Sequence, residues 1–207
     1  EAENGTVSTI KLDGVSFAWS RGHDVLTDLS LELSRGHTLG VVGPSGSGKT
    51  TLGHLVCRLL SPVTGSIVYL DTRGDPIAPS RVSGQVSGVF QQPERQFFLT
   101  TCEEEIRFGP SNLGRELSSE QIHDYFARIG LPYHRFAGRD PFSLSGGEKR
   151  RLAFAAVLAM RPRFIVFDEP TCGLDQEGVG RFVRLAGRLK SQGAGLLIIS
   201  HDGTLLK

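Results

Sequence analysis

Nine consecutive residues have the composition and spacing of a phosphate-binding loop. Their glycines let successive backbone N–H groups turn toward an anion, because no Cβ stands in the way. The lysine adds a positive charge for the β- and γ-phosphates, and the hydroxyl of the threonine that follows it suits Mg²⁺. The pattern G-x-x-x-x-G-K-[ST], a P-loop, therefore predicts a nucleotide phosphate site. It comprises Gly43, Pro44, Ser45, Gly46, Ser47, Gly48, Lys49, Thr50 and Thr51.

The residues on either side of this loop are those that it requires. Residues 38–42 predict a short buried strand, and residues 50–60 have apolar side chains at helical spacing. A strand then leads through the loop into a helix whose N-terminal dipole faces the same anion. A glycine- and serine-rich turn that fits the pattern by chance is the alternative, and the flanking elements argue against it. The apolar residues of the expected helix are Leu52, Leu55, Val56, Leu59 and Leu60.

Polar side chains also follow three other expected strands. Gln91 follows one of them and His201 another. Asp168 and Glu169 follow the continuous apolar run 163–167, which is typical of a strand buried on both faces. In open α/β sheets, ligands bind at the carboxyl ends of the strands. We therefore expect these polar groups to gather at the same edge of the sheet as the P-loop.

The two carboxylates and the histidine predict hydrolytic chemistry. Asp168 is placed to hold Mg²⁺ opposite the Thr50 hydroxyl. Glu169 is expected to position and deprotonate the water that attacks the γ-phosphate. His201 would donate a hydrogen bond to the γ-phosphate and hold the water against Glu169. A histidine at a strand end is by itself more often incidental, and the P-loop context favours the functional role.

The expected elements define an α/β fold in which a P-loop core with a mostly parallel sheet is joined to an antiparallel β part. Residues 7–17 and 29–33 alternate between apolar and polar side chains and predict the antiparallel strands. The middle of the chain is helical in character. Ser118 and Gln121 there have the spacing of a capping box, which predicts the start of a helix.

We expect one domain over residues 1–207 with an inserted helical subdomain. The nucleotide-binding core comprises about residues 1–93 and 161–207, and the helical subdomain about residues 94–160. Within that subdomain, residues 149–160 predict a helix.

The composition argues against several classes of protein. Lys and Arg number 23 and Asp and Glu 22, so no global basic field indicates nucleic acid, and none is expected as a partner. The three cysteines have no C-x-x-C spacing and indicate neither a disulfide framework nor a zinc site. The longest apolar runs are far below the roughly 20 residues that span a bilayer. A role in a membrane process would require another chain to span it.

The segments that contain Ser145 and Asp168 resemble those of the ATP-binding cassette (ABC) ATPases. L-S-G-G-E at residues 144–148 and F-I-V-F-D-E-P-T-x-G-L-D at residues 164–175 are similar to the signature motif, the Walker B motif and the D-loop of that family. Together with the P-loop and the motifs around Gln91 and His201, they occur in the family's order along nearly the whole chain. The resemblance implies ATP hydrolysis, with ATP and Mg²⁺ bound.

The resemblance also implies roles for single residues. Gln91 would be the Q-loop glutamine, a catalytic residue and, with Thr50 and Asp168, a ligand of Mg²⁺. Asp175 would be the D-loop aspartate. Trp19 would stack on adenine; without the resemblance, its ring would as readily cover the edge of the core. In the family, two ATPase subunits clamp two ATP molecules head to tail. The signature residues would complete the ATP site of the opposite subunit: Ser145, Gly146, Gly147 and Glu148.

A narrower resemblance is to the energy-coupling factor (ECF) ATPases, on V-F-Q-Q-P-E-R-Q-F-F at residues 89–98 and E-E-E-I-R-F-G-P at residues 103–110. It implies a second ABC ATPase subunit, identical or different, a transmembrane coupling subunit and a membrane subunit that binds a vitamin or a transition-metal ion. The chain would then lie on the cytoplasmic face of the cell membrane. Phe97 and Phe98 would lie near the docking groove, or alternatively in the core of the helical subdomain.

Three departures from the family and two alternatives accompany this interpretation. Glu148 stands where glutamine is most frequent and Cys172 where a small residue is usual, and the C-terminal end is short for the family. A soluble ABC ATPase acting on DNA or ribosomes would predict long coiled-coil insertions or a second cassette. A P-loop kinase or GTPase switch would have no use for the signature motif or for His201.

Overall fold

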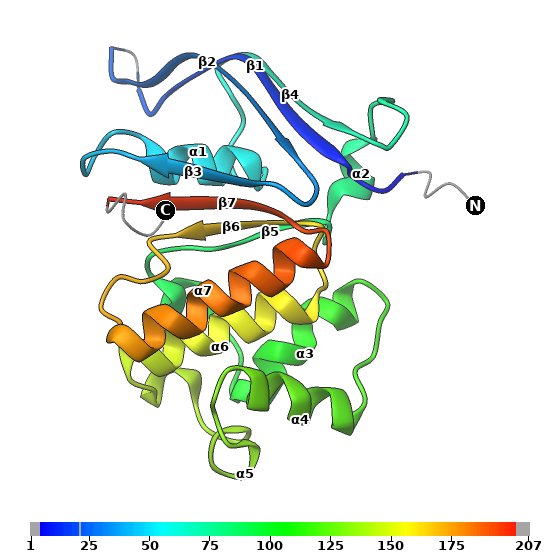
Figure 1. Ribbon diagram of the computed structural model, residues 1–207, viewed down its shortest axis with the longest axis vertical. Helices are drawn as coiled ribbons and strands as arrows, with labels where there is room; N and C mark the ends of the chain where they lie inside the picture. Colours follow the sequence, from blue (N-terminus) through cyan, green and yellow to red (C-terminus); the bar gives the residue numbers. More distant parts are fainter. Residues whose placement is uncertain (1–4, 21, 202–207) are drawn as a thin grey trace. The chain divides into compact units, whose positions relative to one another are not determined.

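The computed structural model describes residues 5–20 and 22–201 of the chain (Figure 1). Backbone contacts divide the chain into two compact units. The first comprises Glu1–Phe90 and Arg163–Lys207, and the second comprises Gln91–Pro162. The expectation of a short C-terminal end concerns residues outside the described part. None of the described helices has the length and apolar character needed to cross a membrane.

The first unit contains a four-stranded parallel sheet in the order β3-β7-β6-β5. Its strands are β3 (Thr38–Val42), β5 (Val86–Val89), β6 (Phe164–Asp168) and β7 (Gly195–Ser200). Strands β6 and β7 are buried along their whole length, as the continuous apolar runs predict. The expectation that β3 is buried was wrong: its side chains are half-buried or exposed, because β3 is an edge strand of this sheet in the described part of the chain.

A three-stranded antiparallel sheet completes the β-structure of the first unit. It has the order β2-β1-β4, with β1 (Thr9–Ala18) between β2 (Asp24–Ser34) and β4 (Thr64–Leu70). Both pairings are antiparallel, so the prediction from the alternating pattern is confirmed. Ile10 and Leu12 on β1 are fully buried and belong to the core that this sheet shares with the parallel sheet.

The described part of the first unit contains three helices: α1 (Lys49–Val56), α2 (Pro79–Val82) and α7 (Gln176–Ser191). Helix α1 follows the P-loop as predicted, and it ends four residues before the expected boundary at residue 60. Arg58 has a φ of 60°, in the left-handed region that ends helices. Leu59 therefore lies outside the helix with 62% of its surface exposed, and the prediction that the helix includes it was wrong.

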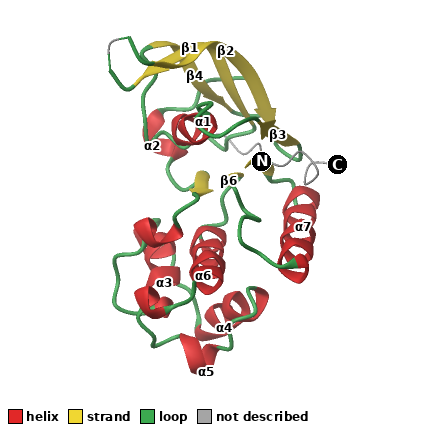
Figure 2. Cartoon of the chain, turned by 90° about the vertical axis from the view of Figure 1, so that its left-hand side faces the viewer, coloured by secondary structure: helices red, strands yellow, loops and turns green. Residues whose placement is uncertain are grey.

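The second unit is helical, and Figure 2 shows its four α-helices grouped together. The longest of them, α6, packs against α3 and α4. In chain order the elements of this unit are η1 (Pro93–Gln96), α3 (Cys102–Asn112), α4 (Ser119–Arg128), α5 (Tyr133–Phe136), η2 (Pro141–Ser143) and α6 (Gly146–Ala159).

Capping boxes begin all three of the longer helices in the second unit. The predicted one at Ser118 is confirmed, with Gln121 N–H donating to its hydroxyl. Thr101 caps α3 and Ser145 caps α6 in the same way. Helix α6 consequently begins at Gly146, three residues before the expected start at residue 149. Each box satisfies two backbone donors that would otherwise lack partners at the helix start.

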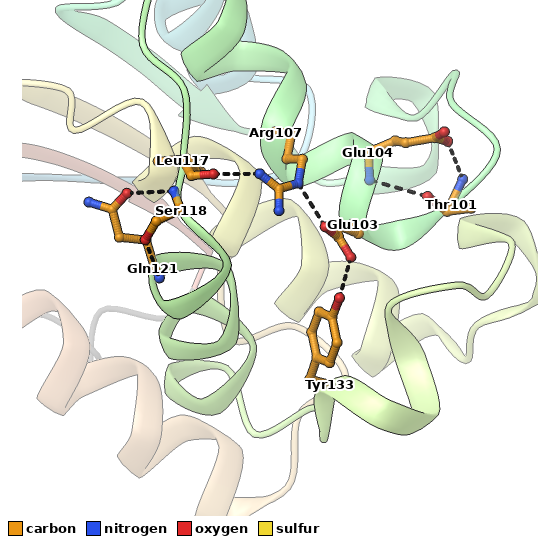
Figure 3. A network of polar contacts seen from close by, with 8 residues as sticks. All are labelled: Thr101, Glu103, Glu104, Arg107, Leu117, Ser118, Gln121 and Tyr133. Carbon is orange, nitrogen blue, oxygen red and sulfur yellow. Dashed lines mark hydrogen bonds and ion pairs between the residues drawn. The ribbon is translucent and has the colours of Figure 1, made fainter.

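A polar network around Glu103 links three segments of the second unit (Figure 3). The Glu103 carboxylate accepts hydrogen bonds from Arg107 Nε at 2.7 Å and from the Tyr133 hydroxyl at 2.6 Å. Arg107 also donates to the Leu117 carbonyl at 2.6 Å. The hydrogen bond from Tyr133, with smaller contributions from Arg107, lowers the pKa of Glu103. Glu103 therefore holds α5 against α3, and Arg107 holds the segment before α4 against α3.

Replacing Tyr133 by phenylalanine is expected to lower the free energy of unfolding by about 1 to 2 kcal/mol at neutral pH, because it removes a hydrogen bond to an ionised group. Since the pKa of Glu103 is lowered in the folded protein, its stabilising contribution is present above its ordinary pKa and is lost as the pH falls through the folded value. Denaturant unfolding at neutral and acidic pH would measure both effects.

The control is Tyr125→Phe on the neighbouring helix α4. The structure gives the Tyr125 hydroxyl no hydrogen bond to the described residues, so this variant should lose less stability and should follow the pH dependence of the wild type. An equal loss in the two variants, or a loss for Tyr133→Phe that is the same at all pH values, would contradict the role of the network.

Candidate functional site

The P-loop connects β3 to α1, where the sequence predicts it. Gly48 is the N-cap of α1 with a φ of 86°, and a Cβ at this position would lie 2.9 Å from the Val25 carbonyl oxygen. Glycine is required there on both counts. Its neighbours Pro44, Ser45, Gly46 and Ser47 are exposed, so the loop presents its backbone to solvent at the start of a helix.

The lysine of the loop is folded back on the loop itself. Lys49 Nζ donates hydrogen bonds to the carbonyl oxygens of Gly43 and Pro44, both at 2.8 Å. The ammonium group therefore lies at the loop and supplies positive charge beside the N-terminus of α1, where an anion binds best. The side chain of Thr51, two residues on, is buried.

Thr50 on α1 and Asp168 at the end of β6 are hydrogen-bonded to each other. The Thr50 hydroxyl donates to Asp168 Oδ2 at 2.7 Å. Asp168 is 2% exposed, and its Oδ1 is buried without a hydrogen-bond partner in the described part of the chain. Burial raises the pKa of Asp168, and the hydrogen bond from Thr50 opposes this. A buried carboxylate oxygen without a partner beside a hydroxyl is a donor set that fits a hard divalent cation such as Mg²⁺.

Glu169 is fixed at the end of β6 in an unusual conformation. Its φ of 50° lies in the left-handed region, which is strained for a glutamate. Its N–H donates to the Ile199 carbonyl at 2.9 Å, and its carboxylate lies 2.8 Å from His201 Nδ1. Glu169 is 8% exposed while His201 is exposed. The glutamate and the histidine, which sequence analysis placed on separate strand ends, therefore form a hydrogen-bonded pair.

Asp175 and Trp19, two other expected site residues in the first unit, have no hydrogen bond to the Thr50, Asp168, Glu169 and His201 group in the described part of the chain. Asp175 is the N-cap of α7 and accepts a hydrogen bond from Gly178 N–H at 2.7 Å. Trp19 is 64% exposed, and its ring contacts the buried Phe17 edge to face at a centroid distance of 5.1 Å. One edge of the indole thus rests on the core, and much of its surface remains open. Stacking on adenine stays a prediction.

Gln91 and the signature residues belong to the second unit. Gln91 is its first residue, and its side chain is exposed. Ser145 is the N-cap of α6, and the Glu148 carboxylate accepts hydrogen bonds from the Ser145 N–H at 2.8 Å and from its hydroxyl at 2.9 Å. These bonds, with the backbone bond as the largest cause, lower the pKa of Glu148. Gly146 and Gly147 form the first turn of α6.

The capping role of Glu148 was missed in the sequence, although the signal for it is present. Ser145 and Glu148 have the S-x-x-E spacing of a capping box. This role also gives a physical reason why a glutamate fits at a position where glutamine is more frequent, since both side chains can accept from the N-cap backbone.

The P-loop follows β3 of the parallel sheet, and Asp168, Glu169 and His201 lie at or just after the carboxyl ends of β6 and β7, with Thr50 hydrogen-bonded to Asp168. This arrangement defines a P-loop nucleoside triphosphatase. Comparison with known proteins gives the family. Residues 26–172 match the family model described as ABC transporter. The chain belongs to this family, whose members bind and hydrolyse ATP.

Individual relatives agree with this assignment. The energy-coupling factor transporter ATP-binding protein EcfA2 of Symbiobacterium thermophilum is 39% identical over 200 residues, which cover 95% of this chain and 68% of that protein. The solved structure of cbiO1 from Clostridium perfringens, part of the ABC transporter complex cbiONQ, has a TM-score of 0.73 at 27% identity and covers 95% of this chain and 79% of that one.

A second solved structure is a dimeric ATP-binding cassette in a post-hydrolysis state with bound ADP and phosphate. Its TM-score is 0.82 at 26% identity, with 95% of this chain and 89% of that chain covered. These likenesses confirm the predicted α/β P-loop fold with its parallel and antiparallel sheets, and the predicted resemblance to ABC ATPases of the energy-coupling factor type.

Proposed function

We propose that this chain is the ATP-hydrolysing subunit of an ECF-type importer for a vitamin or a transition-metal ion. The observation that carries the proposal is the meeting of Thr50, Asp168, Glu169 and His201 beside the P-loop in one unit. Relatives named as energy-coupling factor ATP-binding proteins support the transport role.

The residues of the P-loop bind the phosphates, and Lys49 neutralises charge on the β- and γ-phosphates. Thr50, Asp168 and Gln91 are the proposed ligands of Mg²⁺, which when bound supplies further charge neutralisation. Glu169 takes a proton from the attacking water. His201, hydrogen-bonded to Glu169 in this structure, keeps the carboxylate oriented toward that water and contacts the γ-phosphate. The open surface of the Trp19 indole stacks on adenine.

A second subunit supplies the other half of each ATP site. The N-terminus of α6 carries Ser145, Gly146 and Gly147. Among the described residues, a Cβ added at Gly146 would meet nothing within 4 Å, and one added at Gly147 would meet only Arg151, at 3.6 Å. A helix start of this kind suits an anion. We assign it to the γ-phosphate of the opposite subunit's ATP, with Asp175 in the segment that lies between the two subunits. ATP binding then closes the dimer.

The membrane partner docks on aromatic side chains of the second unit. Phe97 is buried, which supports the alternative of a core position for it, and Phe98 is 60% exposed, which leaves its ring accessible to a partner. Phe98 contacts the half-exposed Phe108 edge to face at 4.6 Å. This exposed aromatic pair, 7 and 17 residues after Gln91, offers a transmembrane coupling subunit an apolar contact. The chain would then lie on the cytoplasmic face of the membrane.

The alternative of a soluble ABC ATPase acting on DNA or ribosomes has less support. That alternative predicts long coiled-coil insertions, and the longest described helix of the second unit, α6, has 14 residues.

Purification of this chain from native membranes, followed by identification of the chains bound to it, tests the transport role. We expect a second ABC ATPase or a second copy of this chain, a transmembrane coupling protein and a membrane protein that binds the substrate. Copies of only this chain, or recovery with ribosomes or DNA, would contradict the ECF assignment.

A further inference from the structure

Phe90 lies against two glycines. A Cβ on Gly88 of β5 would lie 2.9 Å from the Phe90 ring, whereas a Cβ on Gly53 of α1 would lie 3.0 Å from Val166, 3.1 Å from Ile199 and 3.4 Å from the Phe90 ring. Glycine in the interior of a helix or a strand costs roughly 1 kcal/mol relative to alanine. Gly88 therefore leaves the room that the Phe90 ring occupies, and Gly53 lets α1 approach Val166, Ile199 and this ring closely.

The His54 ring packs against the Phe90 ring. The His54 and Phe90 ring centroids are 4.4 Å apart with the ring planes inclined at 55°, and both side chains are half-buried. Aromatic pairs at this separation contribute stability beyond the area that they bury. Phe90 is thus held by α1 on one side and by β5 on the other.

Helix α1 connects the stack of the His54 and Phe90 rings to the candidate Mg²⁺ site at Thr50 and Asp168. His54 lies one turn after Thr50 on α1, so both side chains are on the same face of the helix. Thr50 donates to Asp168 at the end of β6. The parallel register pairs Val89 with Phe167, and the next residue on each strand is Phe90 and Asp168 respectively. One face of the P-loop helix therefore contacts the ends of both β5 and β6.

The stack stands at the junction of the two units. Phe90 is the last residue of the first unit, and Gln91 is the first residue of the second. We propose that His54 and Phe90 form a positioning pair that fixes the start of the Gln91 segment to the P-loop helix, so that Gln91 is held for its part in Mg²⁺ binding and hydrolysis. This inference rests on the proposed function, and neither residue touches the reacting atoms.

Three variants separate positioning from packing. His54→Ala removes the ring, and His54→Phe keeps an aromatic face at the same place. His123→Ala is the matched control, since His123 on α4 contacts Tyr133 at a centroid distance of 3.9 Å in the second unit. It deletes a comparable ring contact in a helix without touching the junction.

The first measurement is amide hydrogen exchange of residues 86–92, which needs no nucleotide. We expect His54→Ala to raise the exchange rate there about fivefold, and His54→Phe and His123→Ala to leave it near that of the wild type. Unchanged exchange in His54→Ala would overturn the proposal, as would exchange in His54→Phe as fast as in His54→Ala.

The second measurement is the ATPase rate as a function of ATP and Mg²⁺ concentration. We expect His54→Ala to lower kcat about fivefold and to raise the Mg²⁺ concentration for half-maximal activity, with KM for ATP within about twofold of the wild type. His54→Phe should restore both values. Faster exchange with unchanged kcat and Mg²⁺ requirement would mean that the stack only packs, and would overturn the proposal.

The two measurements also separate this proposal from the proposed function. If the wild-type protein, assembled with its partners, did not hydrolyse ATP, the proposed function would be wrong, and the exchange of residues 86–92 would still decide whether the stack fixes the junction.

Discussion

Replacing Glu169 by glutamine is expected to lower kcat for ATP hydrolysis about a thousandfold while ATP binding persists. Glutamine has nearly the shape of glutamate, and its side-chain oxygen can still accept the hydrogen bond that the carboxylate shares with His201. The left-handed backbone at this position and the N–H bond to Ile199 are unaffected by the change. The variant therefore removes the proton acceptor and little else.

Single-turnover hydrolysis and equilibrium binding of labelled ATP would measure the two quantities separately. Because bound ATP is not consumed, the variant should also accumulate as a closed dimer, which light scattering detects. Glu177→Gln is the control: this glutamate on α7 is exposed and pairs with Arg181, and its loss should leave kcat unchanged. Hydrolysis by Glu169→Gln at the wild-type rate would exclude Glu169 as the base.

Replacing Lys49 by alanine is expected to raise the Kd for ATP about a hundredfold, because charge-assisted hydrogen bonds to phosphate are lost. In the structure the ammonium group contacts only loop carbonyls among the described residues, at Gly43 and Pro44. Those hydrogen bonds lie in a largely exposed loop, so the free energy of unfolding should change little. We therefore expect Lys49→Ala to weaken ATP binding strongly and to lower the free energy of unfolding only slightly.

Titration with ATP, followed by the fluorescence of Trp19 or of a labelled nucleotide, would measure the affinity. Lys190→Ala, on the exposed end of α7, is the matched control and should bind ATP as the wild type does. An unchanged affinity in Lys49→Ala would contradict the assignment of residues 43–51 as a phosphate-binding loop.

The parallel strands and the P-loop were predictable because their signals are local. A continuous apolar run such as residues 164–167 has few alternatives to a strand buried on both faces, and a glycine-rich loop between a strand and a helix has a known use. The burial of β3 was not predictable in the same way. Its apolar residues resemble those of an interior strand, and its position at the edge depends on which strands pair with it.

The end of α1 and the conformation of Glu169 depend on single backbone angles, and the sequence pattern does not predict such angles. The helical spacing of apolar residues continues past Val56, and the left-handed Arg58 ends α1 before Leu59. Glu169 likewise has a φ that no rule would assign to a glutamate. Its pairing with His201 depends on this angle and on the register of β6 with β7.

The contacts of His54 illustrate a third limit. A histidine within an apolar helix gives no signal by its spacing, and Gly53 and Gly88 lie far apart in the sequence. Only the packing of α1 on the parallel sheet, where Gly53 lies closest to Val166 and Ile199, brings the two glycines near the same aromatic ring. Side-chain fits of this kind arise from long-range contacts, which patterns in one sequence do not encode.

We propose that this chain carries two different half-sites for ATP, one at the P-loop and one at the signature residues, and that each is completed only by another subunit. The most direct test mixes two inactive variants. Ser145→Arg places a bulky charge at the start of α6 and should block hydrolysis at the opposite subunit's site, whereas Glu169→Gln lacks the base in its own site. A dimer with one chain of each kind retains one complete site.

The ATPase rate of the mixture is the quantity to measure. Neither variant alone should hydrolyse ATP, and an equal mixture should recover about a quarter of the wild-type rate, since about half of the dimers are mixed and each has one of two sites intact. Wild-type activity of Ser145→Arg by itself would contradict the claim. So would a mixture as inactive as its components under conditions in which the wild-type chain alone hydrolyses ATP as a dimer.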